Sequence, residues 1–240
     1  MERMAGVHEH LDGDLDAADL AGNLRDLERI NRRLGGGAMS RRAIETLIDG
    51  RGGSRTASAA SYSLLDVGTG SADIPAALLN EARARFTVTA TDVRPEIVAA
   101  AQARHGSIPG LTLGVAEGTA LPWPDDAFDV AHASLLLHHL EPDAAAALLR
   151  ELRRVARLGV VINDLDRSRL AWLGAWLLLH ATTRNRYTLH DGPLSVRRAY
   201  RPDEVRAMAA RAGLREVGRV HGFAHHRYAL AFRPSPEEPG

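Results

Sequence analysis

The sequence predicts an α/β fold with a mostly parallel β-sheet that is covered by helices on both faces. From residue 63 onward, short apolar runs alternate with helical stretches. Several of these runs are apolar on both faces, which is typical of buried parallel strands. Two β-like runs near the end of the chain are joined by a short loop and predict a terminal antiparallel hairpin. The chain of 240 residues suits one domain of this kind.

The expected elements of the first two thirds of the chain follow from periodicity. Leucine and isoleucine at steps of three and four predict a helix over 19–34, ended by three glycines, and a second helix follows over 40–48. Five strands are expected at 63–67, 86–91, 111–115, 128–134 and 159–163. The helices between them are expected at 74–85, 95–104 and 142–157.

After the fifth strand the alternation breaks. Residues 167–199 form an insertion that is partly helical at 170–181, followed by a helix over 202–212 and hairpin strands at 216–221 and 227–232. We therefore divide the chain into an N-terminal helical cap and connector (1–60), a main domain (61–233) and a disordered tail (234–240). Residues 1–16 are expected to be mobile.

Composition excludes several kinds of site. The absence of cysteine excludes disulfides, thiolate metal sites and cysteine nucleophiles. Thirty basic and 30 acidic residues cancel, so no long-range attraction for nucleic acid or an anionic membrane is expected. No apolar run reaches the roughly 18 residues that span a bilayer, and no signal peptide is recognised, so we expect a cytoplasmic protein. The pairs His8/His10 and His225/His226 are judged incidental, and no metal is expected.

The most informative segment is a glycine turn after the first strand. Residues 64–67 run into Gly68-Thr69-Gly70, where glycine permits a tight turn and close approach of a ligand. A dinucleotide fingerprint would place Gly or Ala three residues after Gly70, beside a pyrophosphate. Asp73 stands there instead, and Asp66 precedes the turn. Two carboxylates suit a ligand with an ammonium and a sulfonium group better than a diphosphate.

Carboxylates also follow the next two strands. Asp92 ends the second strand, where a carboxylate can accept hydrogen bonds from both ribose hydroxyls. Glu117 follows the third strand and can accept a hydrogen bond from an adenine amine. An ordinary strand-end Asp and a solvated loop Glu are the structural alternatives at these two positions.

The glycine turn, Asp92 and the stretch from Glu117 to Val130 resemble the class I S-adenosylmethionine (SAM)-dependent methyltransferases, which have a Rossmann-like fold. The resemblance is greatest to the small-molecule branch that includes ubiquinone and menaquinone biosynthesis methyltransferases, and the segment 132–140 is similar to the fourth strand of that branch. It covers residues 64–164 well. Two departures are Glu117, where the family usually has Asp, and a missing Pro-Gly-Gly turn before the fifth strand.

The resemblance implies SAM as the cofactor, S-adenosylhomocysteine (SAH) as its product, and roles for matching positions. The cofactor residues would be Asp66, Gly68, Thr69, Gly70, Asp73, Asp92, Val93, Glu117, Gly118, Thr119, Ser134 and Leu135. The segment 165–200 would form a lid over the methyl acceptor. Its apolar and aromatic character favours an acceptor site that includes Trp172, Trp176, Tyr187, His190 and Tyr200, with ordinary packing as the alternative.

His138 and His139 are the candidate general bases, because they follow the fourth strand at the edge where open α/β sheets bind ligands. The expected reaction is methyl transfer to an O or C nucleophile of a small aromatic, polyketide or quinone-like acceptor, as in secondary metabolism. The alternatives are a nicotinamide-dependent oxidoreductase and a catalytically silent SAM-binding partner subunit. A monomer or homodimer is expected, without a nucleic-acid partner or a membrane span.

Overall fold

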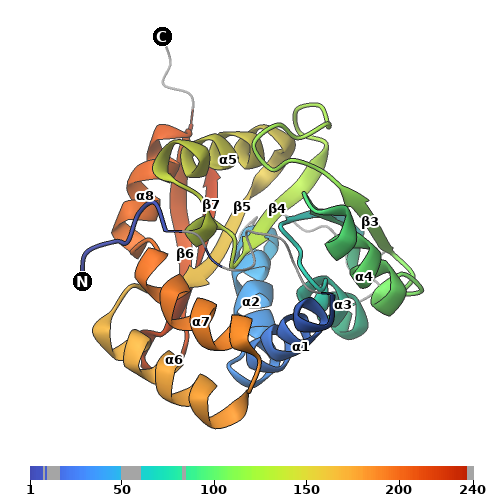
Figure 1. Ribbon diagram of the computed structural model, residues 1–240. Helices are drawn as coiled ribbons and strands as arrows, with labels where there is room; N and C mark the ends of the chain where they lie inside the picture. The colour runs from blue at the N-terminus through green and yellow to red at the C-terminus, as the bar shows by residue number, and fades with distance from the viewer. Residues whose placement is uncertain (8, 10–16, 50–60, 83–84, 237–240) are drawn as a thin grey trace.

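The computed structural model describes residues 1–7, 9, 17–49, 61–82 and 85–236 (Figure 1). The expected connector at 50–60 and most of the expected tail lie outside these residues, as do His8 and His10. Contrary to the expectation of a mobile N-terminus, residues 1–7 are placed against the body of the protein. The N–H of Met4 donates to Arg197 O over 3.0 Å, and Arg3 Nε donates to Arg198 O over 2.8 Å.

A seven-stranded sheet forms the centre of the molecule, in the order β3-β2-β1-β4-β5-β7-β6. Its strands are β1 (Tyr62–Val67), β2 (Phe86–Asp92), β3 (Leu111–Val115), β4 (Phe128–Ser134), β5 (Ala156–Leu165), β6 (Leu214–His221) and β7 (Arg227–Pro234). The first five strands are parallel, and β7 runs antiparallel to both of its neighbours. The predicted parallel sheet with a terminal hairpin is therefore confirmed.

Helices cover both faces of this sheet (Figure 1). They are α1 (Ala17–Arg33), α2 (Gly36–Asp49), α3 (Asp73–Ala82), α4 (Pro95–His105), α5 (Pro142–Val155), α6 (Arg169–Thr182), α7 (Arg186–Arg198) and α8 (Pro202–Arg211). One apolar core lies between the sheet and α5 with α8, around Leu148 and Val205. A second core lies on the other face under α2 and α3, around Leu47 and Leu79.

Two boundaries differ from the sequence prediction. Helix α5 ends at Val155 and β5 begins directly at Ala156, because the chain has no Pro-Gly-Gly turn to separate them. Gly159, expected to start the strand, lies inside it with φ +153°, and a Cβ there would lie 2.1 Å from Phe232 O. Helix α7 was not expected, since the insertion was predicted to be helical only at 170–181.

The strand order reverses between β1 and β4, which lie side by side and lead to opposite halves of the sheet. In open α/β sheets, ligands bind outside the carboxyl ends of the strands at such a switch point. The glycine turn after β1 and the two histidines after β4 both lie at this edge. None of the described helices has the length and apolar character that crossing a membrane requires.

Candidate active site

The glycine turn after β1 has the backbone conformation that its sequence predicts. Gly68 and Gly70 adopt φ of +69° and +56°, where residues with a Cβ are strained. A Cβ on Gly68 would also lie 2.8 Å from the side chain of Leu136, on the turn after β4. The turn is fixed to β2, because the N–H of Thr69 donates to Thr91 O over 2.8 Å.

Asp73 is held in a defined orientation at the start of α3. Asn31 Nδ2, on α1, donates to Asp73 Oδ2 over 3.1 Å, and Ser71 Oγ donates to Asp73 Oδ1 over 3.1 Å. Helix α1 is thereby tied to the glycine turn, as expected for a helical cap over the cleft.

Asp66 is buried under the turn and contacts a histidine that the sequence analysis did not single out. His132 Nδ1 lies 2.5 Å from Asp66 Oδ1, and its Nε2 lies 2.8 Å from Ser40 Oγ on α2. The imidazole ring of His132 and the carboxylate of Asp66 are both almost completely shielded from solvent. This buried chain fixes the carboxylate that precedes the turn.

The Asp92 carboxylate faces backbone donors at the end of β2. Gly70 N–H donates to Oδ2 and Arg94 N–H donates to Oδ1, each over 3.1 Å. Burial raises the pKa of Asp92 above its usual value, although these two hydrogen bonds oppose the shift. The carboxylate is thus oriented across the glycine turn, where it can accept hydrogen bonds from ribose hydroxyls.

A cavity of about 370 Å³ joins these groups and is called the cofactor cavity below. All twelve cofactor residues expected from the resemblance line it. Four of the lining residues are carboxylic acids (Asp66, Asp73, Asp92 and Glu117). Arg94 is the one arginine that the described residues place in the wall, and its guanidinium pairs with the Glu96 carboxylate over 2.7 Å. Such a wall fits a ligand that carries positive charge, and it would repel a diphosphate.

A second cavity of about 520 Å³, the acceptor cavity, lies between α1, α6, α7 and the hairpin tip. Its wall is largely aliphatic and comes mainly from α6. The two cavities share three lining residues, Asn31, Leu135 and His139. Leu135 has a left-handed backbone (φ +53°), an uncommon conformation for a residue with a Cβ that marks strain at functional sites. The turn after β4 therefore carries the boundary between the cavities.

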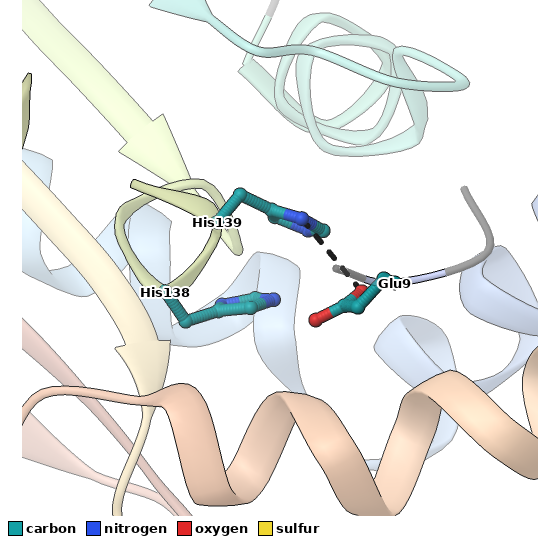
Figure 2. A group of neighbouring side chains, drawn as sticks. All are labelled: Glu9, His138 and His139. Atoms are coloured by element: carbon teal, nitrogen blue, oxygen red, sulfur yellow. Dashed lines mark ion pairs between the residues drawn. The ribbon is translucent and has the colours of Figure 1, made fainter. Parts of the chain in front are cut away.

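His139 lies at this boundary and faces Glu9 from the N-terminal segment (Figure 2). Its Nδ1 lies 3.7 Å from Glu9 Oε2, and its side chain is 25 % exposed. Glu9 itself is buried. Its Oε1 accepts a hydrogen bond from Ser195 Oγ over 2.9 Å and lies 3.7 Å from Arg198 NH1.

His138 is more deeply buried than His139, and it lines only the acceptor cavity and not the cofactor cavity. Its Nδ1 lies 2.7 Å from Asp164 Oδ1, and its N–H donates to Asp164 Oδ2 over 3.1 Å. Burial alone would raise the pKa of Asp164, but the neighbouring His138, with its hydrogen bond, brings that pKa below its usual value. The Asp164 carboxylate thus fixes the short 3₁₀ turn (Leu137–His139) that presents both histidines.

Glu9, His138 and His139 are also the group of described residues that could hold a metal ion, since one ligand atom from each lies within 4.8 Å of the others. Arg198 places a fixed positive charge beside the carboxylate of this group. A divalent cation would have to bind next to that charge. The charge of Arg198 therefore disfavours a divalent cation at this group.

Arg227, from β7, is a buried cation in the wall of the acceptor cavity. It donates to three neutral side-chain oxygens: Asn163 Oδ1 at 2.5 Å, Asn31 Oδ1 at 2.6 Å and Ser134 Oγ at 2.7 Å. Burial lowers its pKa to about 10, while Asp164 and Asp73 oppose the shift. Because Asn31 also binds Asp73, one polar network links the wall of the acceptor cavity to the glycine turn.

The five expected acceptor residues do not line the acceptor cavity. Trp172 and Trp176 are absent from the wall, and the ring of Trp176 stacks on that of His180 with a centroid distance of 4.3 Å. Tyr187 is buried and His190 is exposed beside Asp191. Tyr200 is also buried.

The Tyr200 hydroxyl donates to Leu140 O over 2.9 Å, and burial raises its pKa to about 12. Tyr200 therefore supports the chain that follows His139. The residues that face this cavity are largely aliphatic, and the five expected positions are not among them.

Several residues of the site have no obvious sequence signature. Glu9 lies 129 positions before His138 in a polar segment, and only its burial in the folded chain marks it. Asn31, Asn163 and Arg227 are single polar residues at element ends. The adjacency of Asn163 to Asp164 at the end of β5 was the one pattern that could have drawn attention to this network.

Comparison with known proteins agrees with this site. Residues 64–159, from β1 into β5, match a family described as a methyltransferase domain. The search of curated proteins finds no match. A SAM-dependent methyltransferase from Aquifex aeolicus shares the fold with a TM-score of 0.62 at 18 % identity, over 91 % of this chain and 98 % of that one.

Two further solved structures widen the comparison. Magnesium protoporphyrin IX methyltransferase from Synechocystis PCC 6803, solved with bound SAH, has a TM-score of 0.59 at 14 % identity over 93 % of this chain and 90 % of that one. The cyclase SpnF has a TM-score of 0.57 at 17 % identity over 82 % and 80 %.

The chain therefore has the fold of SAM-dependent methyltransferases, and its residues 64–159 match a methyltransferase domain. The match includes the glycine turn, Asp92, Glu117 and the two histidines, whereas α1, α2, the insertion and the hairpin lie outside it. The class I part of the resemblance is confirmed, and SAM is the cofactor of this class.

Proposed function

We propose that this protein transfers a methyl group from SAM to an oxygen or carbon nucleophile of a small, largely apolar acceptor, of aromatic, polyketide or quinone-like character. The observation that carries the proposal is the meeting of a carboxylate-lined cavity with an aliphatic one at Leu135 and His139. A cationic cofactor fits the first cavity and an apolar acceptor fits the second. Methyl donor and nucleophile would then face each other at their junction.

The chain contributes binding and alignment to this reaction. Asp66 and Asp73 would face the amino-acid part of the cofactor, Asp92 would hold the ribose, and Glu117 to Thr119 would border the adenine. When bound, the cofactor supplies a methyl group that is already activated for displacement, so the protein has to hold the nucleophile in line and exclude water. The aliphatic wall of α6 serves that exclusion.

His139 is the proposed base, because it alone of the two histidines lines both cavities. An imidazole nitrogen of His139 would accept the proton of the acceptor hydroxyl or acidic carbon, which leaves the acceptor an electron pair for the methyl group that the bound cofactor would supply. The imidazolium that results is stabilised by the buried Glu9 carboxylate. His138, fixed by Asp164, positions the turn and contacts the acceptor.

The function is tested in two stages. Isothermal titration with SAH and with NADH separates the methyltransferase from a nicotinamide-dependent oxidoreductase, since the acidic wall predicts binding of SAH alone. SAH production is then measured with a panel of phenols, quinols and β-dicarbonyl compounds. SAH binding without any turnover would favour a silent partner subunit. The turnover assay is needed because a protein of similar fold, SpnF, is a cyclase, so the fold does not by itself establish methyl transfer.

Variants test the assigned base. We expect His139→Gln to lower kcat by about 10²–10⁴-fold, which is the usual contribution of a general base. Glu9→Gln keeps an oxygen that can accept the hydrogen bond from Ser195 but removes the negative charge, so we expect a smaller decrease in kcat of about tenfold. Glu216→Gln, at a half-buried position of the edge strand β6 outside both cavities, is the matched control. Near-normal turnover in His139→Gln with SAH still bound would remove the role, and inhibition by EDTA would favour a metal at Glu9, His138 and His139 instead.

A further inference from the structure

Helix α6 exposes an apolar stripe on the outside of the molecule. Leu170, Leu173 and Leu177 are spaced by three and four residues, so they share one face of the helix. They are 67 %, 46 % and 54 % exposed, and Gly174 lies between them on the same face. Helices of water-soluble proteins normally turn such a stripe toward the core, so this surface is unpartnered in the folded chain.

A second apolar group lies at the same opening. Phe223 is 90 % exposed at the tip of the loop between β6 and β7. The next two residues, Ala224 and His225, adopt left-handed φ angles of 51° and 53°, so the chain turns sharply beneath the ring. Phe223 and the three leucines all line the acceptor cavity, which places them around one mouth.

The charged side chains of the segment 167–190 are all positive, and the two acidic residues that line the cavity, Glu9 and Asp191, are buried. Residues 167–190 contain no Asp or Glu. Exposed arginines flank the apolar helix at both ends, with Arg169 before it and Arg184 and Arg186 after it. The net charge of the whole chain is zero, so the excess of positive charge is local to this segment.

This pattern distinguishes two possible occupants of the surface. In a symmetric dimer through α6, the two helices would run past each other and bring Arg169 of one copy toward Arg184 or Arg186 of the other, with no acidic residue of the segment between them. An anionic lipid surface satisfies both features, because phosphate headgroups attract the arginines while the leucines and Phe223 enter the acyl boundary.

We propose that the face formed by Leu170, Leu173, Leu177 and Phe223, with Arg169, Arg184 and Arg186 around it, docks onto an anionic lipid bilayer without crossing it. The docking is peripheral and reversible, since one short helix and one aromatic ring bury little area. The mouth of the acceptor cavity then faces the acyl region. Lipid-dissolved molecules can enter it without passing through water.

Vesicle sedimentation tests this docking with the full chain. We expect the protein to sediment with vesicles of phosphatidylcholine and phosphatidylglycerol (3:1) at 50 mM salt, to stay in solution with phosphatidylcholine alone, and to be released at 500 mM salt. The double variant Arg169→Glu/Arg184→Glu should lower the partition coefficient by about twentyfold or more, since each basic residue near the surface contributes about fivefold. Arg42→Glu/Arg211→Glu, at exposed positions of α2 and α8, is the matched control and should bind normally.

The apolar part is tested by Leu170→Ser/Leu177→Ser, with Val115→Ser on the half-exposed edge strand β3 as its control. The first should lose about tenfold in vesicle binding and the second nothing. Titration with SAH shows that each variant is folded, and it separates this test from the proposed reaction. The proposal would be overturned if both double arginine variants lost vesicle binding equally, or if the protein bound neutral vesicles as well as anionic ones. It would also be overturned if the protein did not bind vesicles and instead formed a dimer that Leu170→Ser/Leu177→Ser dissociates.

Discussion

Replacement of Arg227 by methionine tests whether the buried network supports the fold. The guanidinium donates to Asn163, Asn31 and Ser134, and it has no carboxylate within ion-pair distance among the described residues. Three hydrogen bonds from a charged donor contribute about 5–9 kcal/mol together. Burial opposes this, because a pKa lowered to about 10 corresponds to a cost of about 3 kcal/mol for keeping the charge. The net loss expected for Arg227→Met is therefore about 2–6 kcal/mol.

The assay is urea unfolding followed by circular dichroism without cofactor. Arg219→Met provides the control, since Arg219 lies on the same hairpin but is exposed and pairs with Glu216 at the surface. Such a pair contributes about 0–1 kcal/mol. A loss below about 1 kcal/mol for Arg227→Met, or one equal to that of Arg219→Met, would refute the view that the network is stabilising.

Three further outcomes follow from the site. Gly68→Ala should lower SAH affinity about tenfold, because φ is +69° and the new Cβ would meet Leu136; unchanged affinity by calorimetry would contradict this. Affinity for SAH should fall as the pH drops through the raised pKa of Asp92, with a midpoint above 3.8, and Asp92→Asn should abolish that dependence. Tyr200 holds its proton more tightly when folded (pKa about 12) than unfolded (about 10), so its contribution to stability is complete below pH 10 and is lost as the pH rises to 12. Tyr200→Phe should make the free energy of unfolding less dependent on pH in that window. At neutral pH it should lower this free energy by about 1 kcal/mol, because the hydrogen bond to Leu140 O is lost.

The parts of the site that could be predicted from sequence are those whose chemistry is local. A strand followed by Gly68-Thr69-Gly70 has few ways to turn, and the carboxyl ends of parallel strands meet at one edge. Asp73, Asp92 and Glu117 follow from the same geometry, so the twelve expected cofactor residues gather around one cavity. The regular alternation of strands and helices predicted the sheet for the same reason.

The acceptor side could not be predicted, because tertiary packing decides which face of a helix points inward. Trp172 and Trp176 were expected to mark the site, yet α6 is rotated so that Leu173 and Leu177 line the cavity. Helix α7 was missed because Pro193 and Gly192 interrupt its pattern, although Asn185 caps it by accepting from the N–H of Thr188 over 3.1 Å. Glu9 reaches the histidines only through the fold of the N-terminal segment.

The two cavities differ in a way that gives the proposed reaction a direction. Methyl transfer converts a sulfonium into a neutral thioether, so the product loses the charge that a wall with Asp66, Asp73, Asp92 and Glu117 attracts. In the proposed reaction, the proton released by the acceptor would add positive charge at His139, beside Glu9, at the boundary between the two cavities. Attraction within the cofactor cavity therefore weakens as the reaction proceeds, while pairing at the junction becomes stronger. Because Leu135 and His139 both belong to the turn after β4 and line both cavities, this turn lies where both changes would occur.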